Sequence, residues 1–132
     1  MINGLWMTFL RVLALVHIAA TITVWAYVMG FPIAGLTPFL DVPMSARAAT
    51  TVLCVLYPLS AIGLWTTHAG GQVIWALTAA FQVVALLSGW IGPLAPWWLL
   101  QAVLGSLALY VLLAALRGWM VRKAWTDSVN AT

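Results

Sequence analysis

The sequence predicts an all-α integral membrane protein, a single four-helix transmembrane bundle over residues 1–132 with both termini in the cytoplasm. The first observation is composition, because 65% of the 132 residues are apolar and the mean hydropathy is +1.10. The second is charge, since charged residues make up only 5% of the chain, against about 25% in soluble domains. The third is that the apolar residues form four runs of roughly 20 residues, the length that crosses a bilayer.

The first predicted span covers about residues 7–29 and ends at a glycine and a proline within 30–32. A secretory signal peptide is the competing interpretation. The apolar run is longer than the 7–15 residues of a typical signal-peptide core, and no clear cleavage site precedes a polar domain, so we expect a retained span. Residues 1–10 are compatible with two placements, either the start of this span or a short surface helix with Trp6 and Phe9 inserted.

An outer loop is predicted at residues 30–45, because this stretch contains three prolines and two glycines. The second span, about 46–65, contains Pro58. Proline lacks the N–H that bonds to the carbonyl four residues earlier, so a kink is expected there. A turn is predicted at residues 66–71, where the pair Gly70-Gly71 is expected to end this helix and let the chain reverse tightly.

The third span is predicted at about residues 72–90, followed by a turn rich in glycine and proline before residue 97. The fourth span covers about 97–116 and leads into a short polar tail at 117–132. The sequence shows no fixed repeat and no separate soluble domain. These assignments complete a bundle of four spans.

The basic residues predict the orientation of the bundle, because cytoplasmic flanks carry the excess of Lys and Arg. Arg117, Arg122 and Lys123 follow the last span and place the C-terminus in the cytoplasm. An even number of spans puts the N-terminus on the same side, which agrees with Arg11. Arg47 is then the one basic residue on the outer side.

The nine tryptophans fit the same layout, since tryptophan anchors helices at membrane interfaces. Trp97 and Trp98 lie at the predicted outer boundary, together with Trp90. Other tryptophans lie near the predicted inner boundary: Trp6, Trp65, Trp119 and Trp125. We therefore interpret Trp97 and Trp98, with the four inner basic residues, as topology anchors.

Small and polar residues at helical spacing predict the faces through which the spans pack, because lipid gives helices no hydrophobic reason to associate. The residues predicted to pack internally or against a partner are Ala14, Thr21, Gln82, Gln101, Gly105 and Ala108. The simplest interpretation is that they hold the four helices together.

His17 is the candidate functional residue, because ionisable side chains inside a membrane are costly and often functional. Thr21 or a glutamine on a neighbouring helix would satisfy its imidazole in a purely structural role. Haem ligation by His17 and His68 is disfavoured, since the two residues are expected at different depths. Two cofactor roles of His17 stay open, namely ligation of a haem shared with a partner and contact with a quinone. Lipids are the only other cofactors considered.

The composition excludes several function classes. The chain has no Glu, and its two Asp residues, Asp41 and Asp127, lie outside the spans, so catalysis by this chain is not expected. Proton-coupled exporters of the small multidrug type resemble it in size only, because they depend on an embedded glutamate. The single cysteine, Cys54, forms no internal disulfide or cysteine zinc cluster, and no basic stripe for nucleic acid is present.

The remaining interpretation is a non-catalytic accessory, structural or assembly subunit of a larger complex in the bacterial inner membrane. Respiratory, photosynthetic and transport assemblies all use such subunits. The alternatives are a homo-oligomeric channel or carrier for a small neutral solute, and a membrane anchor that contacts haem or quinone through His17. Its expected partners are therefore the lipid bilayer and other membrane-protein subunits, including copies of itself.

Overall fold

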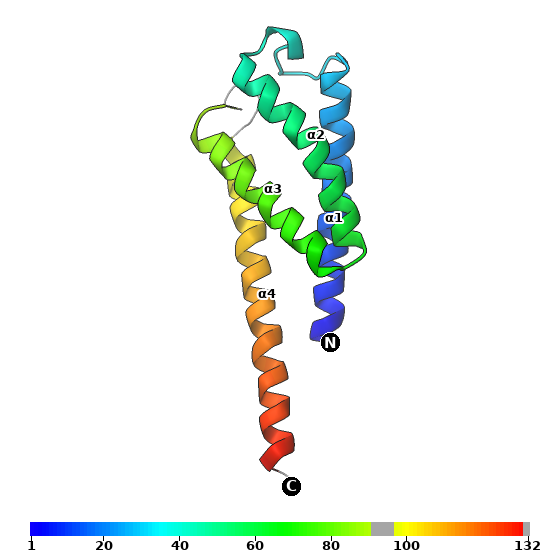
Figure 1. Ribbon diagram of the computed structural model, residues 1–132, viewed down its shortest axis with the longest axis vertical. Helices are drawn as coiled ribbons and strands as arrows, with labels where there is room; N and C mark the ends of the chain where they lie inside the picture. Colours follow the sequence, from blue (N-terminus) through cyan, green and yellow to red (C-terminus); the bar gives the residue numbers. More distant parts are fainter. Residues whose placement is uncertain (91–96, 131–132) are drawn as a thin grey trace.

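A computed structural model of the chain describes residues 1–90 and 97–130, and the side chains of 1–90 and 101–130. This part of the chain contains four α-helices, α1 (Ile2–Val28), α2 (Met44–Trp65), α3 (Ala69–Leu87) and α4 (Trp97–Asn130), and the short 3-10 helix η1 (Phe39–Asp41). Each α-helix is long and apolar enough to cross a membrane. The predicted all-α, four-helix class is therefore confirmed, and the helices indicate a multi-pass membrane protein (Figure 1).

Helix α1 begins five residues earlier than predicted, so residues 2–10 continue the first span as one unbroken helix. It ends in a motif that satisfies its last carbonyl groups. The N–H of Gly30 donates to the Tyr27 carbonyl, and the N–H of Phe31 donates to the Ala26 carbonyl at 3.0 Å. This is the Schellman pattern, and Gly30 supplies its left-handed residue with φ +88°. The predicted break at residues 30–32 is confirmed.

The connection between α2 and α3 differs from the prediction. Gly70 and Gly71 lie in the first turn of α3, and the chain reverses instead at Thr67, which adopts φ +54°. His68 caps α3, because its Nδ1 accepts a hydrogen bond from the N–H of Gly70 at 3.1 Å. The prediction that the glycine pair ends the second helix is wrong.

The glycine at position 71 serves a close approach of two helices. A Cβ atom built on Gly71 would collide with the backbone of Gly63 on α2, and a Cβ on Gly63 would collide with the backbone of Gly71. The two helices therefore cross backbone to backbone at this point. Small residues allow such contacts between membrane helices.

Pro58 lies inside α2, which continues through it. Its missing N–H leaves the carbonyl of Cys54 without the usual helical donor. The indole N–H of Trp25 on α1 donates to this carbonyl at 2.9 Å. A neighbouring helix thus satisfies the backbone group that proline frees, as a low-dielectric membrane requires.

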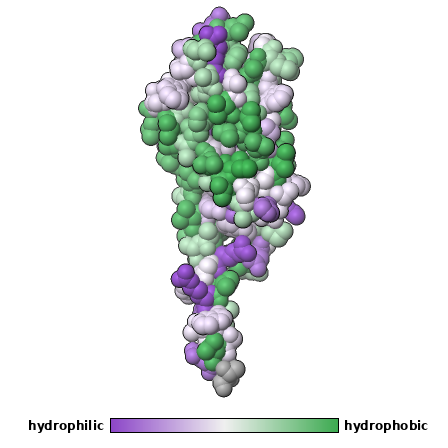
Figure 2. Space-filling view, viewed as in Figure 1, coloured by the Kyte–Doolittle hydropathy of each residue, from purple (hydrophilic) through white to green (hydrophobic). Residues whose placement is uncertain are grey.

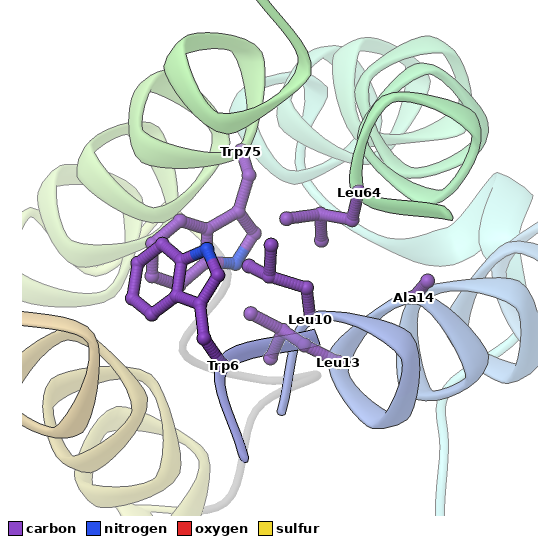
Figure 3. Close-up of a cluster of buried hydrophobic side chains, with 6 residues drawn as sticks. All are labelled: Trp6, Leu10, Leu13, Ala14, Leu64 and Trp75. Carbon is purple, nitrogen blue, oxygen red and sulfur yellow. The ribbon is translucent and has the colours of Figure 1, made fainter. Parts of the chain in front are cut away.

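Two clusters of buried apolar side chains hold the bundle together. The first cluster lies between α1, α2 and α3 (Figure 3) and consists of Trp6, Leu10, Leu13, Ala14, Leu64 and Trp75. Tyr110 of α4 packs against it, with ring centroids 5.1 Å from Trp6 and 5.0 Å from Trp75. The second cluster joins α2 to α3 through Ala49, Leu53, Tyr57 and Ala85. Helix α2 packs extensively against both α1 and α3, whereas α4 is attached along fewer contacts, chiefly to α3.

Helix α4 is the longest element, with 34 residues from Trp97 to Asn130. The predicted polar tail at 117–132 is helical as far as Asn130, so the fourth span and most of the tail form one helix. Its C-terminal part projects beyond the N-terminal end of α1 (Figure 1). The physical reason is that 117–130 contains no proline and several good helix formers. Apolar surface covers the middle of the bundle in this view, whereas hydrophilic surface gathers towards its ends and on the projecting part (Figure 2).

Candidate functional site

Polar side chains are buried inside the bundle at several levels. Among the described residues they are His17, Thr50, Ser60, Thr78 and Gln82. Polar groups within a membrane are costly unless they are paired, and they often mark function. Two of them, His17 on α1 and Gln82 on α3, meet Tyr57 of α2 and line one cavity. This cavity is the candidate site.

The geometry of His17 defines its protonation pattern. Its Nδ1 lies 2.8 Å from the carbonyl oxygen of Leu13. A carbonyl only accepts hydrogen bonds, so Nδ1 carries a proton, and in the neutral form of the ring Nε2 then carries a lone pair. The imidazole meets the ring of Tyr57 edge-on, with 5.7 Å between centroids and 74° between planes. Thr21 donates to the backbone carbonyl of His17 at 2.7 Å, and its hydroxyl is not the partner of the imidazole.

The hydroxyl and amide groups beside His17 pair across α2 and α3. The Nε2 of Gln82 donates to the hydroxyl oxygen of Tyr57. One turn further along α2, the hydroxyls of Ser60 and Thr78 lie 2.8 Å apart. Thr78 also donates to the Ile74 carbonyl at 2.8 Å. These bonds set the rotation of α2 against α3 and so position Tyr57 against His17.

The cavity lined by His17, Tyr57 and Gln82 has a volume of about 130 Å³. Ala102 and Ser106 belong to its α4 wall. A drug-sized ligand fills roughly 300–1,000 Å³, so a haem macrocycle does not fit this cavity. The second histidine, His68, caps α3 and does not line the cavity, so the two histidines do not form a pair of axial ligands here.

The predicted packing residues divide into two groups. Ala14 and Gln82 are buried and Thr21 is half-buried, as expected for residues inside the bundle. On α4, the predicted residues Gln101, Gly105 and Ala108 are exposed in the chain. A different face of α4 packs inward, and it carries Val103, Leu107, Tyr110 and Leu113. The internal-packing interpretation of the α4 stripe is therefore wrong, and its role as a partner-contacting face stays a prediction.

Two of the predicted basic anchors, Arg11 and Arg117, lie against tryptophan rings. The guanidinium of Arg11 lies 5.8 Å from the ring centroid of Trp65, and that of Arg117 lies 5.8 Å from Trp6. Cations over aromatic faces are favourable contacts. Through these two pairs α1, α2 and α4 bring basic and tryptophan side chains together at one end of the bundle.

Two further predicted basic anchors, Arg122 and Lys123, are exposed on the projecting part of α4. The ammonium of Lys123 lies 5.3 Å from the ring centroid of Trp119. The predicted anchors Trp97 and Trp98 begin α4, and their side chains lie outside the described residues.

Sequence reasoning identified His17 but missed Tyr57, the residue that joins His17 to Gln82. The available signal was a tyrosine in the middle of an apolar span, whose hydroxyl must find a partner when it is buried. Within 1–90 and 97–130, no three His, Cys, Asp or Glu residues gather in a way that could hold a metal ion.

Comparison with known proteins places the chain in one family. No curated protein and no solved structure matches it. A family model described as a family of unknown function, DUF6163, matches residues 4–123. This match covers all of α2 and α3 and most of α1 and α4, includes the cavity residues, and stops within the projecting part of α4. The chain therefore belongs to the family of unknown function DUF6163.

Proposed function

We propose that this protein is a non-catalytic accessory or assembly subunit that docks a larger complex of the bacterial inner membrane through α4. In this proposal both termini face the cytoplasm, and the partner is another integral membrane protein. The single observation that carries it is the exposure of α4. Of its described side chains, from residue 101 to 130, Val103 alone is buried within the chain.

The length of α4 supports docking outside the bilayer as well as within it. At 1.5 Å per residue, its 34 residues span about 51 Å. About 20 residues cross the hydrocarbon core, so roughly 14 residues, about 21 Å, project beyond it. On this projecting part Val121 and Trp125 are 64% and 70% exposed. They are four residues apart and therefore share one face of the helix.

An apolar face that projects from the membrane gains free energy when a partner covers it, because apolar area leaves water. Around this face the projecting part carries three basic residues, Arg117, Arg122 and Lys123, and one acidic residue, Asp127. A partner that fits this surface presents an apolar groove with an acidic rim beside the membrane. Within the membrane, the exposed stripe of Gln101, Gly105 and Ala108 lets a partner helix approach closely.

Co-purification tests the proposal with a matched pair of tryptophan variants. The tagged full chain is isolated in mild detergent, and the expected result is a stoichiometric integral membrane partner. Trp125→Ala is expected to release this partner. Trp119→Ala is the control, because Trp119 is also exposed, at 60%, but lies about 120° around the helix and contacts Lys123.

Three results would contradict docking through this face. Equal retention of the partner by both variants shows that the face of Trp125 is not the contact. Equal loss from both variants shows only a general need for aromatic residues at the membrane surface. A homo-oligomer without any partner favours the alternative of a channel or carrier for a neutral solute.

The proposed orientation has its own test. A green fluorescent reporter fused to the C-terminus is expected to fluoresce in the bacterial cytoplasm, and alkaline phosphatase fused at the same place is expected to be inactive. The physical reason is the excess of basic residues at the end of the bundle that carries Arg11 and Arg117. Active phosphatase would place this end outside.

A further inference from the structure

We infer that the cavity beside His17 binds the hydroxylated aromatic ring of a lipid-soluble phenol or quinol. This site is separate from the docking face on the projecting part of α4, and the inference does not depend on that proposal. It rests on three features of the cavity, namely its size, its polar end and its opening towards the bilayer.

The size of the cavity fits one six-membered ring. Its volume is about 130 Å³, and an apolar protein cavity of about 150 Å³ accommodates benzene. Most of its wall is apolar and includes Leu13, Trp75, Ala79 and Val103. A single aromatic ring therefore fits between these side chains, whereas a fused or macrocyclic ring system does not.

The polar end of the cavity calls for a hydrogen-bond donor on that ring. The imidazole uses its Nδ1 for the hydrogen bond to the Leu13 carbonyl, and among the described residues no donor bonds to Nε2. The neighbouring Tyr57 and Gln82 are paired with each other. His17 lines the cavity, and the phenolic hydroxyl of a ligand there supplies a donor for the lone pair on Nε2.

The opening of the cavity indicates the route of entry. Val16 and Ala20 of α1 lie on one side and Ala102 of α4 on the other. Val16 and Ala102 are both exposed on the membrane-facing surface of the chain. The cavity is partly open, and the sparse contact between α1 and α4 makes the gap between these two helices its expected opening. A ligand can enter sideways from lipid and leave an alkyl tail in the bilayer.

Binding of a matched pair of probes to the purified full chain tests the inference. The probes are 4-ethylphenol and ethylbenzene, which differ in one hydroxyl, and equilibrium dialysis measures their affinities in detergent. One hydrogen bond to His17 predicts about tenfold tighter binding of 4-ethylphenol. His17→Leu is expected to abolish this preference while both probes still bind.

A cavity-filling variant keeps the test independent of the polar residues. Ala102→Leu is expected to abolish binding of both probes, because it fills the α4 wall of the cavity. Ala114→Leu is the matched control, since Ala114 is also exposed on α4 but does not line the cavity. It is expected to bind 4-ethylphenol as the wild type does.

The outcomes separate the ligand sources and the alternatives. Tighter binding of 2-decylhydroquinone than of 4-ethylphenol would identify a membrane quinol, and the reverse order would identify a phenol without a tail. Equal affinities for 4-ethylphenol and ethylbenzene would overturn the role of His17. The site would be overturned if neither probe binds the wild type, or if both probes bind the Ala102→Leu variant as tightly as the wild type.

Discussion

The crossing of α2 and α3 at Gly63 and Gly71 leads to a prediction with a defined sign. Substitution Gly71→Ala adds one methyl group that meets the Gly63 backbone. A side-chain obstacle could rotate away, but a backbone cannot. The helices must therefore separate by on the order of 1 Å to restore van der Waals contact. Separation also stretches the hydrogen bond between Ser60 and Thr78, which joins the same two helices.

Three contributions determine the magnitude of this change, one favourable and two unfavourable. Alanine favours a helix over glycine by about 0.8–1.0 kcal/mol. Overpacking of a tight contact costs about 1–3 kcal/mol, and the upper end applies because the obstacle is backbone. Stretching the hydrogen bond adds roughly 0.6 kcal/mol. We expect Gly71→Ala to lower the free energy of unfolding by about 2.7 kcal/mol.

The matched control is Gly105→Ala on α4, where an added Cβ meets nothing within 4 Å. Only helix propensity acts there, so we expect a gain of about 0.5–1 kcal/mol. Unfolding of both variants in mixed micelles, followed by far-ultraviolet circular dichroism against the fraction of denaturing detergent, measures both changes. The double variant Gly63→Ala/Gly71→Ala is expected to cost less than the sum of the single ones, because one separation relieves both collisions.

The reasoning fails if Gly71→Ala is as stable as Gly105→Ala or more stable than the wild type. Such a result would mean that the two helices do not touch at these glycines. Full additivity of the two substitutions would point to two unrelated local effects and would contradict a shared crossing point.

Two further predictions concern polar groups inside the bundle, and the same unfolding assay measures them. Tyr57→Phe leaves the Gln82 amide without its partner and is expected to lower the free energy of unfolding by about 1–2 kcal/mol. The double variant Tyr57→Phe/Gln82→Leu is expected to be closer to the wild type in stability. Equal losses of stability in the two variants would argue against the hydrogen bond. Trp25→Phe removes the donor to the Cys54 carbonyl and is expected to cost about 0.6–1.5 kcal/mol. In a Pro58→Ala background, where the helix supplies its own N–H, that cost is expected to fall, and an unchanged cost would separate Trp25 from Pro58.

Much of the fold follows from the sequence because a bilayer imposes length and polarity on each span. The second span ends at Trp65 and the fourth helix begins at Trp97, as predicted. The glycine pair at 70 and 71 shows the limit of local signals. Glycine punctuates turns, but it also allows close helix contact, and only the position of Gly63 in space distinguishes these roles.

The inward face of α4 could not be predicted for a related reason. In a soluble bundle, polarity separates the inside from the outside, but lipid is as apolar as a protein core. The small and polar residues of α4 therefore did not determine which face of this helix packs inward. The face that packs is the one whose Tyr110 fits between Trp6 and Trp75 and donates to Gln72 at 2.8 Å.

The candidate site was predictable in part. His17 stands out as a buried ionisable residue, and the structure does place it inside the bundle, 8% exposed. Its contact with Tyr57 depends on the rotation of α2, which the bonds between α2 and α3 determine. A single sequence does not contain that rotation in any local pattern.

The length and sparse attachment of α4 give it the mechanics of a lever. The apolar residues through which it packs extend to about Leu113, and some 20 residues separate Tyr110, which is anchored on α3, from the end at Asn130. That arm measures about 30 Å, so a tilt of 10° at the anchor would move its tip by roughly 5 Å. A change of one ångström in the width of the cavity between α1 and α4 would therefore be magnified at the far end of the helix.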